Sequence, residues 1–186
     1  AVYDFEVPET VLNDFHKFCL QEQITPVMAF MAVLKLLIYR YTGQVDMVVG
    51  LPVFNRPHKE TEKLIGFFVN TLAVRTIITE GRAVTFRELL QCVRKSALSA
   101  YEHQEMPFEK LVEVMQPERS TSHNPIVQTM LSIGAKSSET GNKQRMGAHW
   151  AAYQIERNSA NFDLTLEITE LSSPKFAFVY RTELFK

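Results

Sequence analysis

The chain has 186 residues, of which 46% are hydrophobic and 11% aromatic, a composition typical of one globular domain and not of a disordered chain. Twenty basic residues oppose 21 acidic ones, so the charge favours neither nucleic acid nor an anionic membrane as a partner. The closest candidate for a membrane span, residues 27–41, is interrupted by Lys35 and Arg40, which favours a core helix instead.

The remaining compositional signals concern compartment and metal binding. Cys19 and Cys92 each lie in an apolar helical pattern, so we interpret both as buried thiols in a reducing compartment. The chain starts with the residues AVYD, which do not resemble a signal peptide, and we therefore expect a cytoplasmic protein. No two of the five histidines have the spacing of metal ligands, so we expect no metal site.

The first quarter of the chain predicts a strand and two helices. Alternating apolar residues over 1–7 indicate a short strand, and Pro8 begins a helix with apolar residues at helical spacing. Thr25, followed by a proline, is a helix start, and this second helix is expected to run to Tyr41 and to end at Gly43. It is apolar on nearly every face, so we expect it to be deeply buried.

The middle of the chain predicts two strands and two helices. Residues 45–52 and 67–78 have the composition of strands, and the polar residues 54–62 between them indicate a loop or a short helix. Thr85 caps an amphipathic helix that continues to about Tyr101. The apolar side chains of that helix expected to point inward are Phe86, Leu89, Leu90 and Val93. A second helix, over residues 108–115, begins after Pro107 and ends before Pro117.

From residue 126 onward the pattern indicates strands. They are expected over residues 126–133, 149–155, 162–170 and 175–181. Residues 134–147 are rich in serine, glycine and lysine and are expected to form a mobile surface loop. Together these elements predict one domain of the α+β class, with a mixed β-sheet packed against helices.

The residues alone offer little catalytic chemistry. No glycine-rich turn follows a strand, and no serine lies in a nucleophile-elbow pattern. His103 lies beside Gln104 where proline breaks a helix, a position that suits either a structural role or a side chain directed across a cleft. Asn70 lies inside an apolar strand and needs several hydrogen bonds if it is buried. It is either a clamp on neighbouring backbone or an amide at the wall of a channel.

Three phrases in the second and third quarters of the chain carry a family resemblance. Residues 65–76 read IGFFVNTLAVRT, residues 101–109 read YEHQEMPFE, and residues 122–129 read SHNPIVQT. In this order and spacing they resemble the C-terminal half of the condensation domain of nonribosomal peptide synthetases. That family has a two-lobed, chloramphenicol-acetyltransferase-like fold, so the resemblance implies that this chain forms one lobe.

The resemblance extends over essentially the whole chain and assigns two groups of residues. Those implied to line a substrate channel are Phe54, Phe68, Asn70, Thr71, His103 and Gln104. Those that match structural motifs of the family are Asn55, Arg56, Gly66, Arg75, Pro107, Phe108, Asn124, Pro125 and Asp163. Phe54 departs from the family, whose members usually carry a small residue there, and this difference narrows the channel or alters the choice of acceptor.

The resemblance also implies a reaction and its partners. An aminoacyl amine on one carrier protein attacks the acyl or peptidyl thioester on another, and both substrates arrive on phosphopantetheine arms, with no cofactor bound directly. Implied partners are the N-terminal lobe of the same domain, the upstream and downstream carrier proteins, and an adjacent adenylation domain. The family's catalytic phrase, His-His-x-x-x-Asp-Gly, belongs to the N-terminal lobe and does not occur in the 186 residues, so no catalytic residue is assigned here.

Two alternatives remain open at this point. One is another acyltransferase of the same superfamily that uses free coenzyme A, although the basic residues such a pocket needs are not clustered in the sequence. The other is a non-catalytic lobe that docks carrier proteins. In each case an isolated lobe would expose an apolar face, and we expect it to self-associate.

Overall fold

A computed structural model describes residues 1–56, 58–78, 85–118, 120, 122–134, 159–169 and 174–185. Its centre is a six-stranded sheet in the order β1-β6-β5-β4-β2-β3. The strands are β1 (Val2–Phe5), β2 (Asp46–Val53), β3 (Asn70–Ile77), β4 (Thr129–Ile133), β5 (Leu164–Ile168) and β6 (Phe176–Tyr180). β2, β4 and β5 run parallel to one another and the remaining pairs are antiparallel, which confirms the predicted mixed sheet and α+β class.

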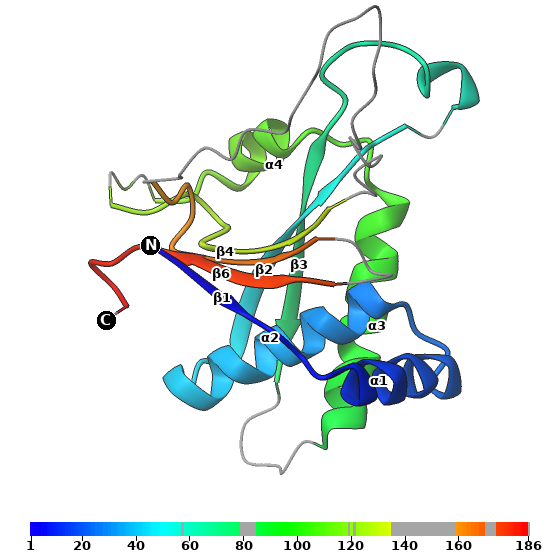
Figure 1. Cartoon of the computed structure of the whole chain (residues 1–186). Coiled ribbons are helices and arrows are strands. Elements are labelled where there is room, and N and C mark those ends of the chain that lie inside the picture. Colours follow the sequence, from blue (N-terminus) through cyan, green and yellow to red (C-terminus); the bar gives the residue numbers. More distant parts are fainter. Residues whose placement is uncertain are drawn as a thin grey trace, which may run out of the picture.

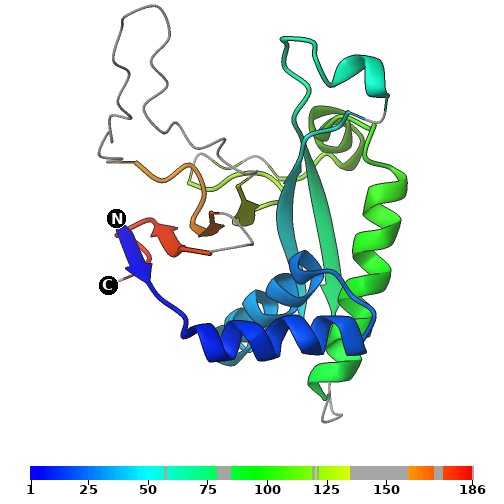
Figure 2. The ribbon, with the colours of Figure 1, turned by 45° about the vertical axis from the view of Figure 1, so that its right-hand side comes forward.

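The helices that cover the sheet are mainly α2 and α3 (Figures 1 and 2). The helices are α1 (Glu9–Gln21), α2 (Pro26–Thr42), α3 (Phe86–Glu102) and α4 (Phe108–Met115), with a short 3₁₀ turn over Lys59–Thr61. α3 packs against β3 and α2, α1 packs on α2, and α4 contacts β3. The hydrophobic core therefore lies between α2, α3 and the inner face of the sheet.

The predicted helix signals form as local chemistry requires. The Thr25 hydroxyl accepts a hydrogen bond from the Met28 N–H at 3.3 Å, and α2 ends at Gly43 in the left-handed region with φ of 69°. Thr85 and Glu88 form a reciprocal capping box at the start of α3. The predicted start and end of α4 are confirmed at Phe108 and Met115.

Several strands are shorter than predicted, because a strand ends where its partner does. β3 was expected from residue 67 but begins at Asn70, which pairs with Val53, the last residue of β2. The strands expected over 162–170 and 175–181 shorten to β5 and β6, which pair only from Leu164 to Ile168. The expected strand 149–155 and the expected loop after Gly134 lie outside the described residues.

The strand expected over 126–133 begins three residues late, at Thr129. Ile126 has φ of 62°, and the Val127 N–H donates to the Pro125 carbonyl at 2.6 Å, so this part of the chain turns. Val127 is then buried over Gly50 of β2, where an added Cβ would come within 2.6 Å of its side chain. The turn thus packs a loop onto the sheet where the sequence indicated a longer strand.

One burial prediction is wrong. Cys92 is exposed, because α3 directs Leu89, Leu90 and Val93 inward and Cys92 lies outside that face. The predicted deep burial of α2 is confirmed for the side that faces the core, whereas Val33, Leu37 and Tyr41 form an exposed stripe along it. Among the described residues no single helix is long and apolar enough to cross a membrane; α1 and α2 pass that test only as a pair bent by 108°.

Lys35, which interrupts the apolar run of α2, is fully buried. Its ammonium group donates to the Val74 carbonyl and to the Thr76 hydroxyl, each at 2.7 Å, and so ties α2 to β3. Burial lowers the pKa of Lys35 to about 7, although the nearby carboxylate of Asp46 opposes the shift. The amine is therefore tethered by polar partners in a place that disfavours its charge.

Lys35 makes stability depend on pH in a defined window. The pKa of Lys35 is about 7 in the folded chain and 10.5 in the unfolded chain. Between these two pH values the amine is therefore mostly protonated only in the unfolded chain. Stability should therefore rise with pH across that window, by at most about 1.4 kcal/mol per unit, and level off below pH 7. Urea unfolding of the chain and of Lys35→Met from pH 6.5 to 10 should show this slope only with Lys35.

The matched control for this experiment is Lys17→Met, because Lys17 is exposed and its ion pair is with Asp14 on the surface of α1. Its stability curve should run parallel to that of the unchanged chain over the whole pH range. A Lys35→Met curve with the same slope as the unchanged chain would show that Lys35 keeps its proton when folded.

Candidate functional site

The loop from the end of β2 to the start of β3 is organised around Arg56. Its guanidinium donates to the carbonyls of Thr61 and Leu64 and lies over the ring of Phe68, 4.1 Å from the centroid. Asn55, just before it, adopts a left-handed backbone with φ of 48°. These contacts give the loop a fixed shape although it contains little regular structure.

Apolar side chains project outward from this same loop. Ile65 is fully exposed and Phe67 is 92% exposed, and Leu64 and Val69 are also exposed. Large apolar side chains gathered on an ordered surface mark an interaction site more often than an ordinary surface. The loop therefore presents an apolar edge, residues 64–69, whose base is held by Arg56.

Both polar atoms of the Asn70 side-chain amide are hydrogen-bonded to nearby backbone. Its Nδ2 donates to the carbonyls of Gln104 and Met106, at 2.8 and 2.7 Å. Its Oδ1 accepts from the N–H groups of Thr71 and Phe108, at 2.9 and 3.0 Å. This is the arrangement that a backbone clamp requires, and it joins the start of β3 to the turn between α3 and α4.

A pocket of about 450 Å³ lies where β2 and β4 end. Its described lining residues are Val27, Leu51, Pro52, Val53, Phe54, Asn55, Arg56, Tyr101, Gln104, Ile133 and Gly134. Burial raises the pKa of the Tyr101 phenol, so this side chain is a neutral hydroxyl at physiological pH. The Asn70 clamp fixes the backbone of Gln104, which contributes to the wall.

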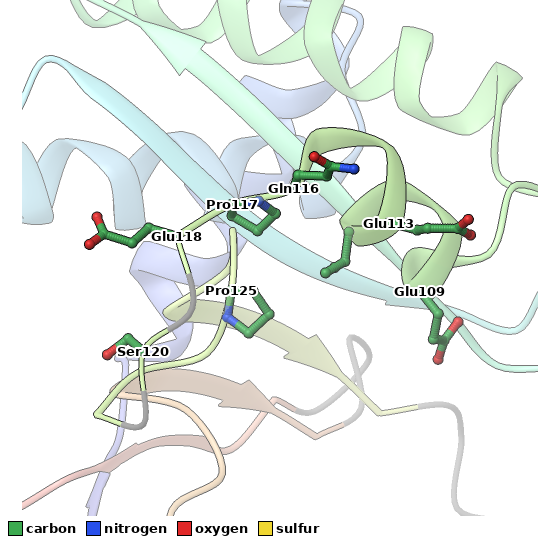
Figure 3. Close-up of a pocket in the computed structure, with 8 residues that line it drawn as sticks. Glu109, Glu113, Gln116, Pro117, Glu118, Ser120 and Pro125 are labelled. Atoms are coloured by element: carbon green, nitrogen blue, oxygen red, sulfur yellow. The ribbon is translucent and has the colours of Figure 1, made fainter.

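A second, wider pocket of about 910 Å³ lies between α4 and residues 117–125 (Figure 3). α4 supplies Glu109 and Glu113, and the facing segment supplies Glu118, Ser120 and Pro125. Lys110 pairs with Glu113 at 2.9 Å on the surface of α4. This pocket therefore has an acidic rim, and among the described residues none lines both it and the pocket where β2 and β4 end.

The other motif residues make structural contacts. Arg75 of β3 forms a two-point ion pair with Asp46 of β2, at 2.8 and 2.6 Å, which lowers the pKa of that carboxyl through hydrogen bonding. Arg181 contacts both Asp163, at 3.1 Å, and the Ser122 carbonyl. The Asn124 amide donates to the Asn161 carbonyl at 2.6 Å.

These contacts hold the turn before β4 against the start of β5 and the end of β6. Gly66 is a glycine for a steric reason, because an added Cβ would meet the Phe68 ring at 3.0 Å. Pro107 and Phe108 provide the start of α4.

The structure brings only part of the predicted channel residues together. Phe54 and Gln104 line the smaller pocket, and Phe68 and Asn70 support its walls from behind. Thr71 pairs with Pro52 in the sheet, and His103 is exposed; neither lines a described pocket. Val27, Tyr101 and Ile133 also line this pocket but were not predicted from the sequence. Each lies in a helical or strand pattern in which it looks like an ordinary core residue.

No group of three or more metal-binding side chains is present in the described parts of the chain. The polar atoms near the smaller pocket are amides, a phenol and a guanidinium that is already bonded to carbonyls. Such groups bind and orient a ligand, and none of them is a general base at neutral pH.

Comparison with known proteins identifies the family of this chain. The sequence profile described as the Condensation domain matches residues 2–186. The chain is 38% identical over 186 residues to tyrocidine synthase 3 of Brevibacillus parabrevis, covering 98% of this chain and 3% of that protein. It is 33% identical over 188 residues to gramicidin S synthase 2 of Aneurinibacillus migulanus, covering 100% of this chain and 4% of that protein. The chain therefore spans a small part of each relative.

Two solved structures share the fold. A four-domain nonribosomal peptide synthetase, bound to AMP and glycine, superposes with a TM-score of 0.85 at 20% identity, over 98% of this chain and 15% of that one. The X-domain from teicoplanin biosynthesis gives a TM-score of 0.85 at 21% identity, over 100% of this chain and 42% of that one.

The hydrogen bonds of Asn70 lead to a stability prediction. In Asn70→Ala, two N–H groups and two carbonyls lose a partner next to a side chain that is only 8% exposed. Stability should fall by roughly 1–3 kcal/mol, measured by urea unfolding. Asn13→Ala on the exposed face of α1 is the matched control and should change stability little.

A variant that keeps its stability but loses turnover in a complete domain would contradict the clamp. That result would assign Asn70 to the channel wall instead.

Proposed function

Because the chain belongs to the condensation domain family, we propose that it forms one lobe of an enzyme that makes amide bonds between carrier-bound substrates. In this proposal the amine of a carrier-bound aminoacyl group attacks the thioester of a carrier-bound acyl or peptidyl group. The new C–N bond replaces the C–S bond, and the donor's thiol leaves with a proton. The match of the family profile to residues 2–186 carries this proposal.

The role of this lobe is to supply a wall and a contact surface. The catalytic phrase His-His-x-x-x-Asp-Gly does not occur in the 186 residues, and we assign it to an opposing lobe. The apolar edge, residues 64–69, is ordered by Arg56 yet exposed, which supports its assignment to the contact with that lobe. Carrier proteins bearing phosphopantetheine arms and an adenylation domain are the further partners in this proposal.

The 186-residue chain alone should not catalyse condensation. Amide formation needs a positioned base and a thioester held in attack geometry, and the chain lacks the family's base. Product measured by mass spectrometry of the acceptor carrier protein should equal the background without enzyme. The control is the complete two-lobed domain, which should form product from the same loaded carriers. Turnover by the 186 residues alone would contradict the assignment of catalysis to the opposing lobe.

The same chain should self-associate through the apolar edge. Ile65 and Phe67 lose water contact if two copies meet there, so light scattering should show a mass that rises with concentration. Replacing both residues by serine should shift this rise to at least tenfold higher concentration. Tyr41→Ser is the matched control, since Tyr41 is 85% exposed but lies on α2. A chain that stays monomeric throughout would refute the apolar edge as a contact surface.

A further inference from the structure

The pocket where β2 and β4 end has the composition of a small-molecule site. Its walls include the apolar side chains of Val27, Leu51 and Ile133, and the polar groups are few. Its volume of about 450 Å³ falls within the range of roughly 300–1,000 Å³ typical of ligand pockets. Such a mixture suits a mainly apolar group with one or two hydrogen bonds at its edge.

The charge of the pocket restricts what enters it. Arg56 is the charged residue among the described lining residues, and no carboxylate accompanies it. Its guanidinium is directed to the carbonyls of Thr61 and Leu64 and to the Phe68 ring. An ammonium or guanidinium group entering the pocket would lose water and find a like charge, which is unfavourable. The pocket therefore disfavours basic side chains.

Asn55 adds a polar side chain to the pocket. Its Oδ1 is buried and has no hydrogen-bond partner among the described residues. A buried acceptor without a partner costs about 1–3 kcal/mol, so native proteins rarely leave one without a reason. Since Asn55 lines the pocket, its amide can turn toward a donor on an occupant.

Phe54 lines the same pocket while 60% of its surface remains exposed. It extends from the carboxyl end of β2, directly after Val53. A side chain that is partly in the pocket and partly in solvent limits the size of what passes it. Phe54 is therefore placed to select by volume.

We propose that this pocket receives an uncharged, mainly apolar side chain of a carrier-bound substrate, and that Phe54 sets the size it accepts. The proposal rests on the proposed function and adds the selectivity of one site to it. The side chain belongs either to the aminoacyl acceptor or to the last residue of the donor. Both sources present the same chemistry, so the experiment varies them separately.

The test uses the complete condensation domain with its carrier proteins and two pocket variants. Phe54→Ala widens the pocket, and Val27→Phe fills it from the start of α2. For each protein, kcat/KM is measured with tryptophan, leucine, alanine and lysine on the acceptor, and then with the same set on the donor. The ratio of two substrates within one preparation does not depend on how much of the protein is folded.

The effect is expected in either the acceptor series or the donor series. In that series, Phe54→Ala should raise the ratio of kcat/KM for tryptophan to kcat/KM for alanine about 10-fold, and Val27→Phe should lower this ratio by a similar factor. Lysine should remain a poor substrate in both variants. The matched control is Tyr41→Ala, an exposed aromatic about 20 Å along α2 from Val27, which should leave every ratio unchanged.

Ratios that stay within twofold in both pocket variants, on both the donor and the acceptor, would overturn the pocket while normal product formation upholds the proposed function. Lysine preferred over leucine in the unchanged domain would also overturn the pocket. No product from the complete domain with any of these substrates would overturn the proposed function and the pocket together.

Discussion

The hydrogen bonds of Asn70 are the constraint on which the arrangement of the site depends. α4 has no fully buried residue, so core packing holds it less firmly than it holds α2 or α3. Its first N–H, on Phe108, instead donates to the Asn70 amide, which also receives the turn that leads to α4 through its bonds to two carbonyls. One buried amide therefore joins the start of β3, the turn after α3 and the start of α4.

β3 is the last strand of the described sheet and has a strand partner on one side only. Polar side chains of α2 and of the β2–β3 pair add further contacts to it. Lys35 reaches it from α2 through the Val74 carbonyl and the Thr76 hydroxyl, and Arg75 ties it to Asp46 of β2. Burying the Lys35 amine costs free energy, and the hydrogen bonds that join α2 to β3 offset part of that cost.

The helices could be predicted from the sequence because their signals are local. Thr25 and Thr85 start helices through hydrogen bonds to residues within one turn, and Pro107 does so through its fixed backbone angle. Strand ends could not be predicted equally well, because β3 begins where β2 supplies a partner, and that partner is distant in the sequence. The buried Lys35 was missed for the same reason, since its two acceptors lie 39 and 41 residues away.

The pocket was only partly predictable, because four segments far apart in the chain contribute to it. Phe54 and Gln104 were identified through family motifs, whereas Val27 and Ile133 look like ordinary core residues until β2, β4 and α2 are assembled. Arg56 links this pocket to the apolar edge, since it lines the pocket and also bonds the Leu64 carbonyl. A partner that presses on residues 64–69 would therefore act on the same guanidinium that forms a pocket wall. The proposed contact with an opposing lobe and the shape of the pocket would in this way both depend on one loop.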